Sequence, residues 1–133
     1  MSDNRYKLSS GCVYNINYHI VFCPKYRRQV LIDSVASDLK ELIYKKAKEI
    51  GIEIEGIEIM PDHVHLFVSA KPTMPIHYIV QQIKGSSSHV LRTKYEHLRR
   101  KLPTLWSRSY YVGTAGFVSQ TVIQNYIANQ KGK

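Results

Sequence analysis

Two histidines, His63 and His65, stand two residues apart inside an apolar, β-branched run at positions 60–68. Side chains alternate between the two faces of a strand, so on a strand both imidazoles and Phe67 point to the same side. Two neutral imidazoles on one strand can bind a divalent cation and leave positions for a third residue, water or a substrate oxygen. This stretch is therefore a candidate metal site, although two solvent-facing or hydrogen-bonded histidines give the same pattern.

The two cysteines, Cys12 and Cys23, stand at opposite ends of one expected strand. They cannot form a disulfide within that strand without a sharp bend, so we expect reduced, packed thiols. A zinc site that joins them to His63 and His65 is an alternative, but their spacing matches no Cys-x-x-Cys pattern.

The length of 133 residues and the hydrophobic content of 44% fit one domain that spans residues 1–133. No apolar run approaches the ~20 residues that a membrane-spanning helix needs, and the first ten residues are polar rather than typical of a signal peptide. We therefore expect a cytoplasmic protein that does not insert into a membrane.

The chain is strongly basic, with 19 Lys and Arg against 10 Asp and Glu and a net charge of +9. Such a balance indicates a polyanionic partner. The bases gather at residues 25–28 and 84–101, which predicts a path for nucleic acid; a solvated basic face is the alternative. Binding to a membrane surface is disfavoured, because neither segment forms a strongly amphipathic helix with a Trp, Phe and Leu face.

Apolar periodicity predicts the elements that must position these residues. The expected strands cover residues 12–22, 52–59, 63–68 and 105–113, and the expected helices cover residues 33–50, 76–91 and 119–130. The order strand, helix, strand, strand, helix, strand is the split βαβ arrangement of ferredoxin-like and RRM-like domains. We predict an α+β fold: an antiparallel sheet with helices on one face, the histidines on the other, and an extra C-terminal helix.

Individual residues mark the ends and irregularities of these elements. Asp33 or Ser34 is the expected N-cap of the helix at 33–50, and Gly51 is its expected C-cap. The alternation of the next strand changes parity at Gly56, as it does at a β-bulge.

Two segments offer residue types that bind nucleic acid. One aromatic side chain stands among three cations, a combination suited to stacking on a base while holding phosphates, in Lys25, Tyr26, Arg27 and Arg28. The second helix has a small, polar middle at Ser87 beside Lys84, where a phosphodiester chain can approach, and Arg92 and Lys94 follow. The alternatives are a turn with ordinary surface charges and a packing surface for another helix.

The expected C-terminal helix carries Tyr126, with Gln130 one turn further on. A tyrosine hydroxyl has a pKa of ~10 and is a weak nucleophile at neutral pH, so attack on a phosphate needs a metal acting as Lewis acid. Residues 113–116 contain two glycines and can act as a hinge before the helix. A tyrosine that only packs in the core is the alternative.

Four stretches in order along the chain carry a resemblance to a known family: HIVFCPKYRR at 19–28, MPDHVH at 60–65, KGSSS at 84–88 and NYIANQ at 125–130. With them the sequence resembles the single-tyrosine transposases of the His-hydrophobic-His (HUH) endonuclease superfamily. These are small insertion-sequence enzymes that act on single-stranded DNA.

The resemblance implies a role for each site residue. His63 and His65 match the metal-binding pair, Gln130 matches the third ligand, and Tyr126 matches the nucleophile. The implied cofactor is Mg²⁺ or Mn²⁺, and imidazole ligands favour manganese. The implied reaction is attack by Tyr126 on single-stranded DNA, which forms a 5′-phosphotyrosine and releases a 3′-hydroxyl that later joins strands.

The resemblance also implies partners. Members of this family recognise imperfect hairpins at the ends of their elements. They act as homodimers with composite active sites, in which the tyrosine helix of one subunit docks against the histidine pair of the other. We expect the same hairpin substrate and the same homodimer here.

Two other functions remain open. A non-catalytic module of RRM-like fold binds single-stranded nucleic acid on sheet aromatics, whereas this sheet exposes histidines. A relaxase or replication initiator of the same superfamily shares the chemistry but usually has a longer chain with further domains.

Overall fold

The structure is a computed structural model that describes residues 7–9, 11–114 and 120–133. Its elements in chain order are β1 (Lys7–Ser9), β2 (Cys12–Tyr14), β3 (Asn17–Phe22), the 3-10 turn η1 (Lys25–Arg27), α1 (Asp33–Ile50), β4 (Glu53–Met60), β5 (His63–Ser69), α2 (Ile76–Lys94), α3 (Glu96–Lys101), β6 (Tyr111–Thr114) and α4 (Gln120–Ala128).

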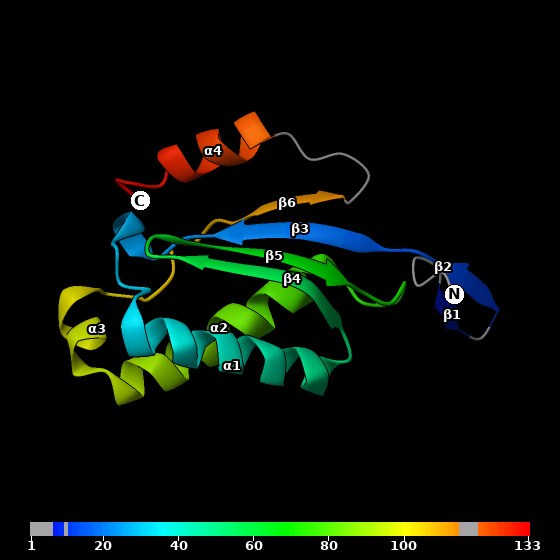
Figure 1. The fold of residues 1–133 in the computed structure, drawn as a ribbon, viewed down its shortest axis with the longest axis horizontal. Helices are drawn as coiled ribbons and strands as arrows, with labels where there is room; N and C mark the ends of the chain where they lie inside the picture. The colour runs from blue at the N-terminus through cyan, green and yellow to red at the C-terminus, as the bar shows by residue number, and fades with distance from the viewer. Residues whose placement is uncertain (1–6, 10, 115–119) are drawn as a thin grey trace.

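Four of the strands form one antiparallel sheet in the order β4-β5-β3-β6. Helices α1 and α2 cover one face of this sheet, and α4 lies on the opposite side (Figure 1). The strand order is that of the split βαβ domains, and the additional C-terminal helix is present. The predicted fold class is therefore confirmed.

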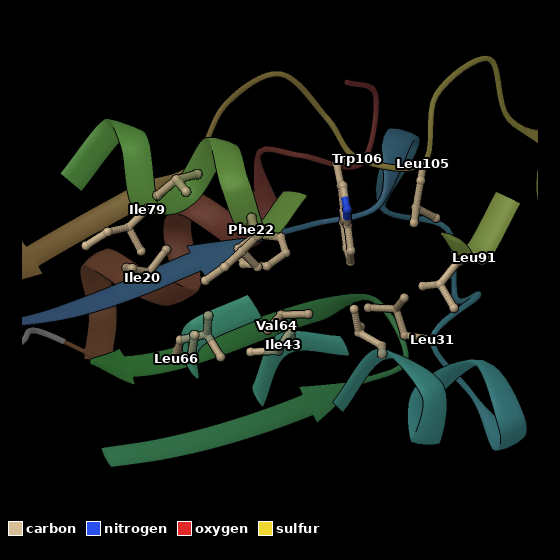
Figure 2. Close-up of a cluster of buried hydrophobic side chains, with 14 of the residues drawn as sticks. Ile20, Phe22, Leu31, Ile43, Val64, Leu66, Ile79, Leu91, Leu105 and Trp106 are labelled. Carbon is tan, nitrogen blue, oxygen red and sulfur yellow. The ribbon is translucent and has the colours of Figure 1, made fainter. Parts of the chain in front are cut away.

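The hydrophobic core lies between the sheet and helices α1 and α2. Ile20 and Phe22 from β3 and Val64 and Leu66 from β5 are fully buried there (Figure 2). The intervening residues of β5 are only half-buried, because successive side chains of a strand point to opposite faces. Core packing thus fixes β5 with its two histidines turned away from the core.

The single strand predicted at 12–22 is two strands. β2 pairs with β1 in a separate two-stranded ribbon, and only β3 enters the main sheet (Figure 1). The break falls at Asn15, whose side-chain oxygen accepts a hydrogen bond from the Asn17 amide. The alternation continues across the break, so sequence periodicity cannot reveal it.

The strand predicted at 105–113 is shorter than expected, because only β6 pairs with β3 in a continuous ladder. Upstream, Trp106 makes one isolated bridge with Pro24. The carbonyl oxygens of Ser107 and Ser109 accept hydrogen bonds from the Lys84 ammonium at 2.7 and 3.3 Å. The half-buried Lys84 side chain therefore binds the backbone here, where no neighbouring strand of the described chain pairs with it.

Boundary residues were predicted with mixed success. The N-cap of α1 is Ile32, without a side-chain capping bond, so the expectation of Asp33 or Ser34 was wrong. Gly51 is the C-cap in a left-handed conformation (φ 83°), as predicted. The pairing register shifts between Ile54 and Gly56, which confirms the predicted bulge.

The cysteines are both free, as expected, but only Cys23 is packed; Cys12 is exposed, so the expectation of a packed thiol was wrong there. Among the described residues, no helix has both the length and the apolar character that crossing a membrane requires. Of the expected hinge at 113–116, residues 115 and 116 lie outside the described residues, as does the first residue of the helix predicted at 119–130.

The burial of one face of β5 in the core gives a stability prediction. Leu66→Ala removes a fully buried side chain from the middle of the core, and we expect it to lower the free energy of unfolding by about 2–5 kcal/mol. The matched control Leu8→Ala changes a side chain that is 78% exposed and should alter it by no more than about 0.5 kcal/mol. Equal losses in urea denaturation would contradict this assignment of the core.

Candidate functional site

His63 and His65 share the face of β5 that points away from α1 and α2, which we call the histidine face of the sheet. The Nδ1 atom of His63 lies 2.9 Å from a carboxylate oxygen of Asp62. The other oxygen of Asp62 lies 3.3 Å from Nε of Arg27. The carboxylate thus orients the imidazole of His63, and Arg27 orients the carboxylate.

A third histidine, His19 on β3, joins this face. Its Nδ1 lies 3.0 Å from Nε2 of His65, and its ring stacks on Phe67 with 4.6 Å between centroids. Burial lowers the pKa of both His19 and His65, which favours the neutral form of each ring. The sequence alone could not predict this contact, because it does not show that β3 and β5 are neighbours.

The histidine pair suits a divalent cation. Within the described part of the chain, Nε2 of His63 has no protein partner, and a histidine held by a carboxylate through its other nitrogen is the usual arrangement of a metal ligand. The described residues contain no group of three or more His, Cys, Asp or Glu side chains able to hold a metal. The zinc site that would join Cys12 and Cys23 to the histidines is therefore not formed among these residues.

Tyr126 and Gln130 converge on one hydroxyl. Oγ of Ser109 lies 2.9 Å from the Tyr126 hydroxyl and donates to Oε1 of Gln130 at 3.0 Å. Helix α4 ends at Ala128, so Gln130 occupies the turn after the helix rather than the helix itself; its side chain is only 4% exposed. Burial raises the pKa of Tyr126, which holds the hydroxyl in its protonated form.

Further contacts hold α4 against its own chain. Nη1 of Arg27 donates to the carbonyl oxygen of Ile127 at 3.2 Å, and the rings of Tyr111 and Tyr126 are 6.3 Å apart. In the described residues, no hydrogen bond or ring contact joins Tyr126 to the histidines. The structure thus brings together Tyr126 with Gln130, and His63 with His65, as two separate pairs.

The loop at residues 25–28 has an unusual backbone. Tyr26 and Arg27 both have positive φ angles, 59° and 51°, a conformation that side chains with a Cβ rarely adopt. The turn is held by Lys25 N–H, which donates to the Leu105 carbonyl at 2.8 Å. Strain of this kind collects at functional sites.

This backbone conformation leaves the Tyr26 ring partly exposed with cations beside it, Lys25 at 5.2 Å and Arg28 at 6.0 Å from its centroid. A hollow of about 540 Å³ opens here; its lining residues are Tyr26, Arg27, Arg28, Gln29, Asp62 and Lys131. The candidate basic loop and the histidine pair therefore meet through Asp62.

The residues of α2 that were predicted to bind nucleic acid make contacts within the protein. Ser87 is 1% exposed; its hydroxyl donates to the Ile83 carbonyl at 2.6 Å and accepts from the Trp106 indole at 3.1 Å. The expectation that it contacts nucleic acid is therefore corrected: it lies inside the protein. Arg92 donates to the Leu102 carbonyl at 2.9 Å, and Lys94 pairs with Asp38 at 2.7 Å.

Comparison of the sequence with known proteins gives consistent matches. The family model described as "Transposase IS200 like" matches residues 12–130. The ISDra2 transposase TnpA of Deinococcus radiodurans is 40% identical over 129 residues, which cover 96% of this chain and 92% of that protein. The transposase for insertion sequence element IS200 of Salmonella typhimurium is 33% identical over 119 residues, 88% of this chain and 78% of that protein.

Two solved structures resemble the fold. The crystal structure of a transposase from Deinococcus radiodurans R1 superposes with a TM-score of 0.85 at 38% identity, covering 96% of this chain and 99% of that chain. A REP-associated tyrosine transposase bound to a REP hairpin has a TM-score of 0.59 at 14% identity, covering 98% of this chain and 70% of that chain. The second similarity is one of fold.

The burial of Ser87 gives a prediction that separates packing from DNA contact. Ser87→Ala leaves the buried Trp106 indole N–H without its acceptor, so we expect a loss of about 1–3 kcal/mol in the free energy of unfolding. Affinity for single-stranded DNA should not change. The control Ser34→Ala alters an exposed serine and should change stability by less than about 0.5 kcal/mol. Weaker DNA binding with unchanged stability would contradict the structural role.

Lys84 gives a prediction about pH. Burial lowers the pKa of Lys84 from 10.5 to about 8, so between these values the folded chain releases a proton that the unfolded chain keeps. The stability of the wild type should therefore rise, relative to Lys84→Met, as pH increases from about 8 to 10.5. Denaturation of both proteins across this range measures the difference.

A matched control for this series is Lys40→Met, which changes an exposed lysine on α1. An equal rise with both variants would come from the loss of a positive charge rather than from burial of the Lys84 amine. A flat difference for Lys84→Met would show that the Lys84 amine is solvated rather than buried.

Proposed function

The chain belongs to the family of IS200-like transposases, and from this membership we propose that it cleaves and rejoins single-stranded DNA with Tyr126 as nucleophile. The observation that most supports this chemistry is the convergence of the Tyr126 hydroxyl and the Gln130 amide on Ser109. Helix α4, which carries the tyrosine, lies on the side of the sheet that bears the histidines (Figure 1).

The proposed reaction is a transesterification. The Tyr126 oxygen attacks a phosphodiester phosphorus, loses its proton, and forms a 5′-phosphotyrosine while the bond to the 3′-oxygen breaks and a 3′-hydroxyl leaves. A 3′-hydroxyl then attacks the phosphotyrosine, re-forms a phosphodiester and returns the proton to Tyr126. Each step exchanges one phosphoester for another, so no external energy source is required.

A divalent cation is the proposed cofactor. His63, His65 and Gln130 would hold Mg²⁺ or Mn²⁺, which would polarise the scissile phosphate as a Lewis acid. The chain's own residues prepare this site: Asp62 orients His63, and the oxygen of Gln130 is an acceptor already placed beside the nucleophile.

The tyrosine must change its surroundings to react. In the structure burial raises the pKa of its hydroxyl, which disfavours the ionised nucleophile, and the hydrogen bond to Ser109 offsets this only in part. We infer that α4 moves away from Ser109 and packs against a histidine pair. In a homodimer the other subunit supplies this pair, which gives composite active sites. The hydrogen bonds that hold α4 through Ser109 and Arg27 would have to break in such an exchange.

The basic loop is the proposed route of the DNA. Tyr26 can stack on a base, and Arg28 and Lys131 can hold phosphates in the hollow beside Asp62. The REP-associated relative is bound to a hairpin, and we propose that this chain likewise takes single-stranded DNA with imperfect hairpins. A non-catalytic binding module of the same fold would use the same loop without forming a covalent bond.

A covalent adduct tests the proposal. Labelled single-stranded DNA with hairpin ends is mixed with the protein, with and without Mn²⁺ or Mg²⁺, and denaturing gels reveal any protein–DNA adduct. We expect a metal-dependent adduct in the wild type and none in Tyr126→Phe, because the phenyl ring has no nucleophile. The control Tyr44→Phe changes an exposed tyrosine of α1 and should form the adduct at the wild-type rate.

The alternatives give different results. Tight binding without an adduct, for any metal and for varied hairpins, would favour the non-catalytic module. An adduct that persists in Tyr126→Phe would assign the nucleophile to another residue.

A further inference from the structure

The contact between His19 and His65 constrains the protons on both rings. Nδ1 of His19 and Nε2 of His65 are 3.0 Å apart, a hydrogen-bond distance, and a bond between two neutral imidazoles has one N–H donor and one lone-pair acceptor. Two arrangements are possible, and they differ in whether a nitrogen of His65 keeps a free lone pair.

If His19 donates, His65 accepts at Nε2 and carries its own proton on Nδ1. Neither nitrogen of His65 then has a free lone pair for a metal ion. If His65 donates instead, its proton is on Nε2 and the lone pair of Nδ1 is free. Only the second arrangement allows His65 to be a metal ligand while the observed contact persists.

We propose that His19 is a positioning residue that accepts the Nε2–H of His65 and so presents Nδ1 of His65 as the metal-binding atom. The inference deepens the proposed function and rests on it, because it takes His65 as a ligand. His19 itself binds neither metal nor DNA in this role; it fixes the tautomer and the ring orientation of its neighbour.

The surroundings of His19 suit this role. Its ring is stacked on Phe67, and the antiparallel pairing of β3 with β5 sets His19 opposite Phe67 and Val21 opposite His65. The sheet register thus fixes the backbone of His19, and the stacking on Phe67 restrains its ring.

The two histidines of the pair then have matching supports. Asp62 holds His63 at Nδ1 and leaves Nε2 free, while His19 holds His65 at Nε2 and leaves Nδ1 free. Each imidazole has one nitrogen engaged by the protein and one available, which is the usual arrangement of metal-ligating histidines. The supports differ, however, because Asp62 is adjacent in sequence and His19 comes from the neighbouring strand.

Two measurements on the metal-free and metal-bound protein test the proposal. Nitrogen-15 NMR of the metal-free wild type reports which nitrogen of His65 carries the proton, and we expect Nε2. Calorimetric titration with Mn²⁺, without DNA, reports affinity in the wild type and three variants. His19→Phe keeps a ring on Phe67 but removes the acceptor, and we expect about 10–100-fold weaker binding.

The other two variants separate the hydrogen bond from mere packing. His19→Gln restores an acceptor oxygen, so its Mn²⁺ affinity should lie closer to the wild type than that of His19→Phe. His89→Phe makes the same change at an exposed histidine of α2 and should bind like the wild type. Circular dichroism melts confirm that each variant is folded.

Three results would overturn the inference: a His65 proton on Nδ1, equal Mn²⁺ affinity in wild type and His19→Phe, or a Mg²⁺-induced NMR shift that identifies a His19 nitrogen as a ligand. Failure of the proposed function looks different, because the wild type itself would then bind no Mn²⁺ and form no Tyr126 adduct.

Discussion

The two-residue alternation of β5 is the constraint on which the site depends. Val64 and Leu66 are fully buried against α1 and α2. Because side chains alternate, this packing places His63 and His65 on the opposite face of the strand. A change of pairing register by one residue would place both imidazoles in the core. The hydrophobic effect therefore positions the site residues, although no apolar side chain takes part in the chemistry.

Local patterns in the sequence predicted the parts of the fold that depend on local physics. The alternation at β5, the parity change at Gly56 and the left-handed cap at Gly51 each follow from the few residues around them. The sequence therefore identified the histidine face. The contact of His63 with Asp62 was not predicted, although the two residues are adjacent.

The parts that sequence missed depend on partners far along the chain. His19 meets His65 only because β3 and β5 are neighbours, and Ser109 meets Tyr126 only because α4 folds back over the sheet. Lys84 and Ser87 have residue types typical of phosphate binding. In the structure, Lys84 instead donates to the backbone of the segment that follows α3, and Ser87 accepts a hydrogen bond from the Trp106 indole. Side-chain type alone does not separate a buried donor from an exposed one.

The left-handed backbone at Tyr26 and Arg27 has a consequence for protein engineering. Arg27 bonds both Asp62 and the carbonyl of Ile127, so one strained residue links the support of His63 to the helix that carries Tyr126. A search for thermostable variants would select changes that relax this turn, because relief of backbone strain raises stability. Such variants would be expected to lose activity, because the strained backbone that lowers stability also holds Arg27 against Asp62 and Ile127.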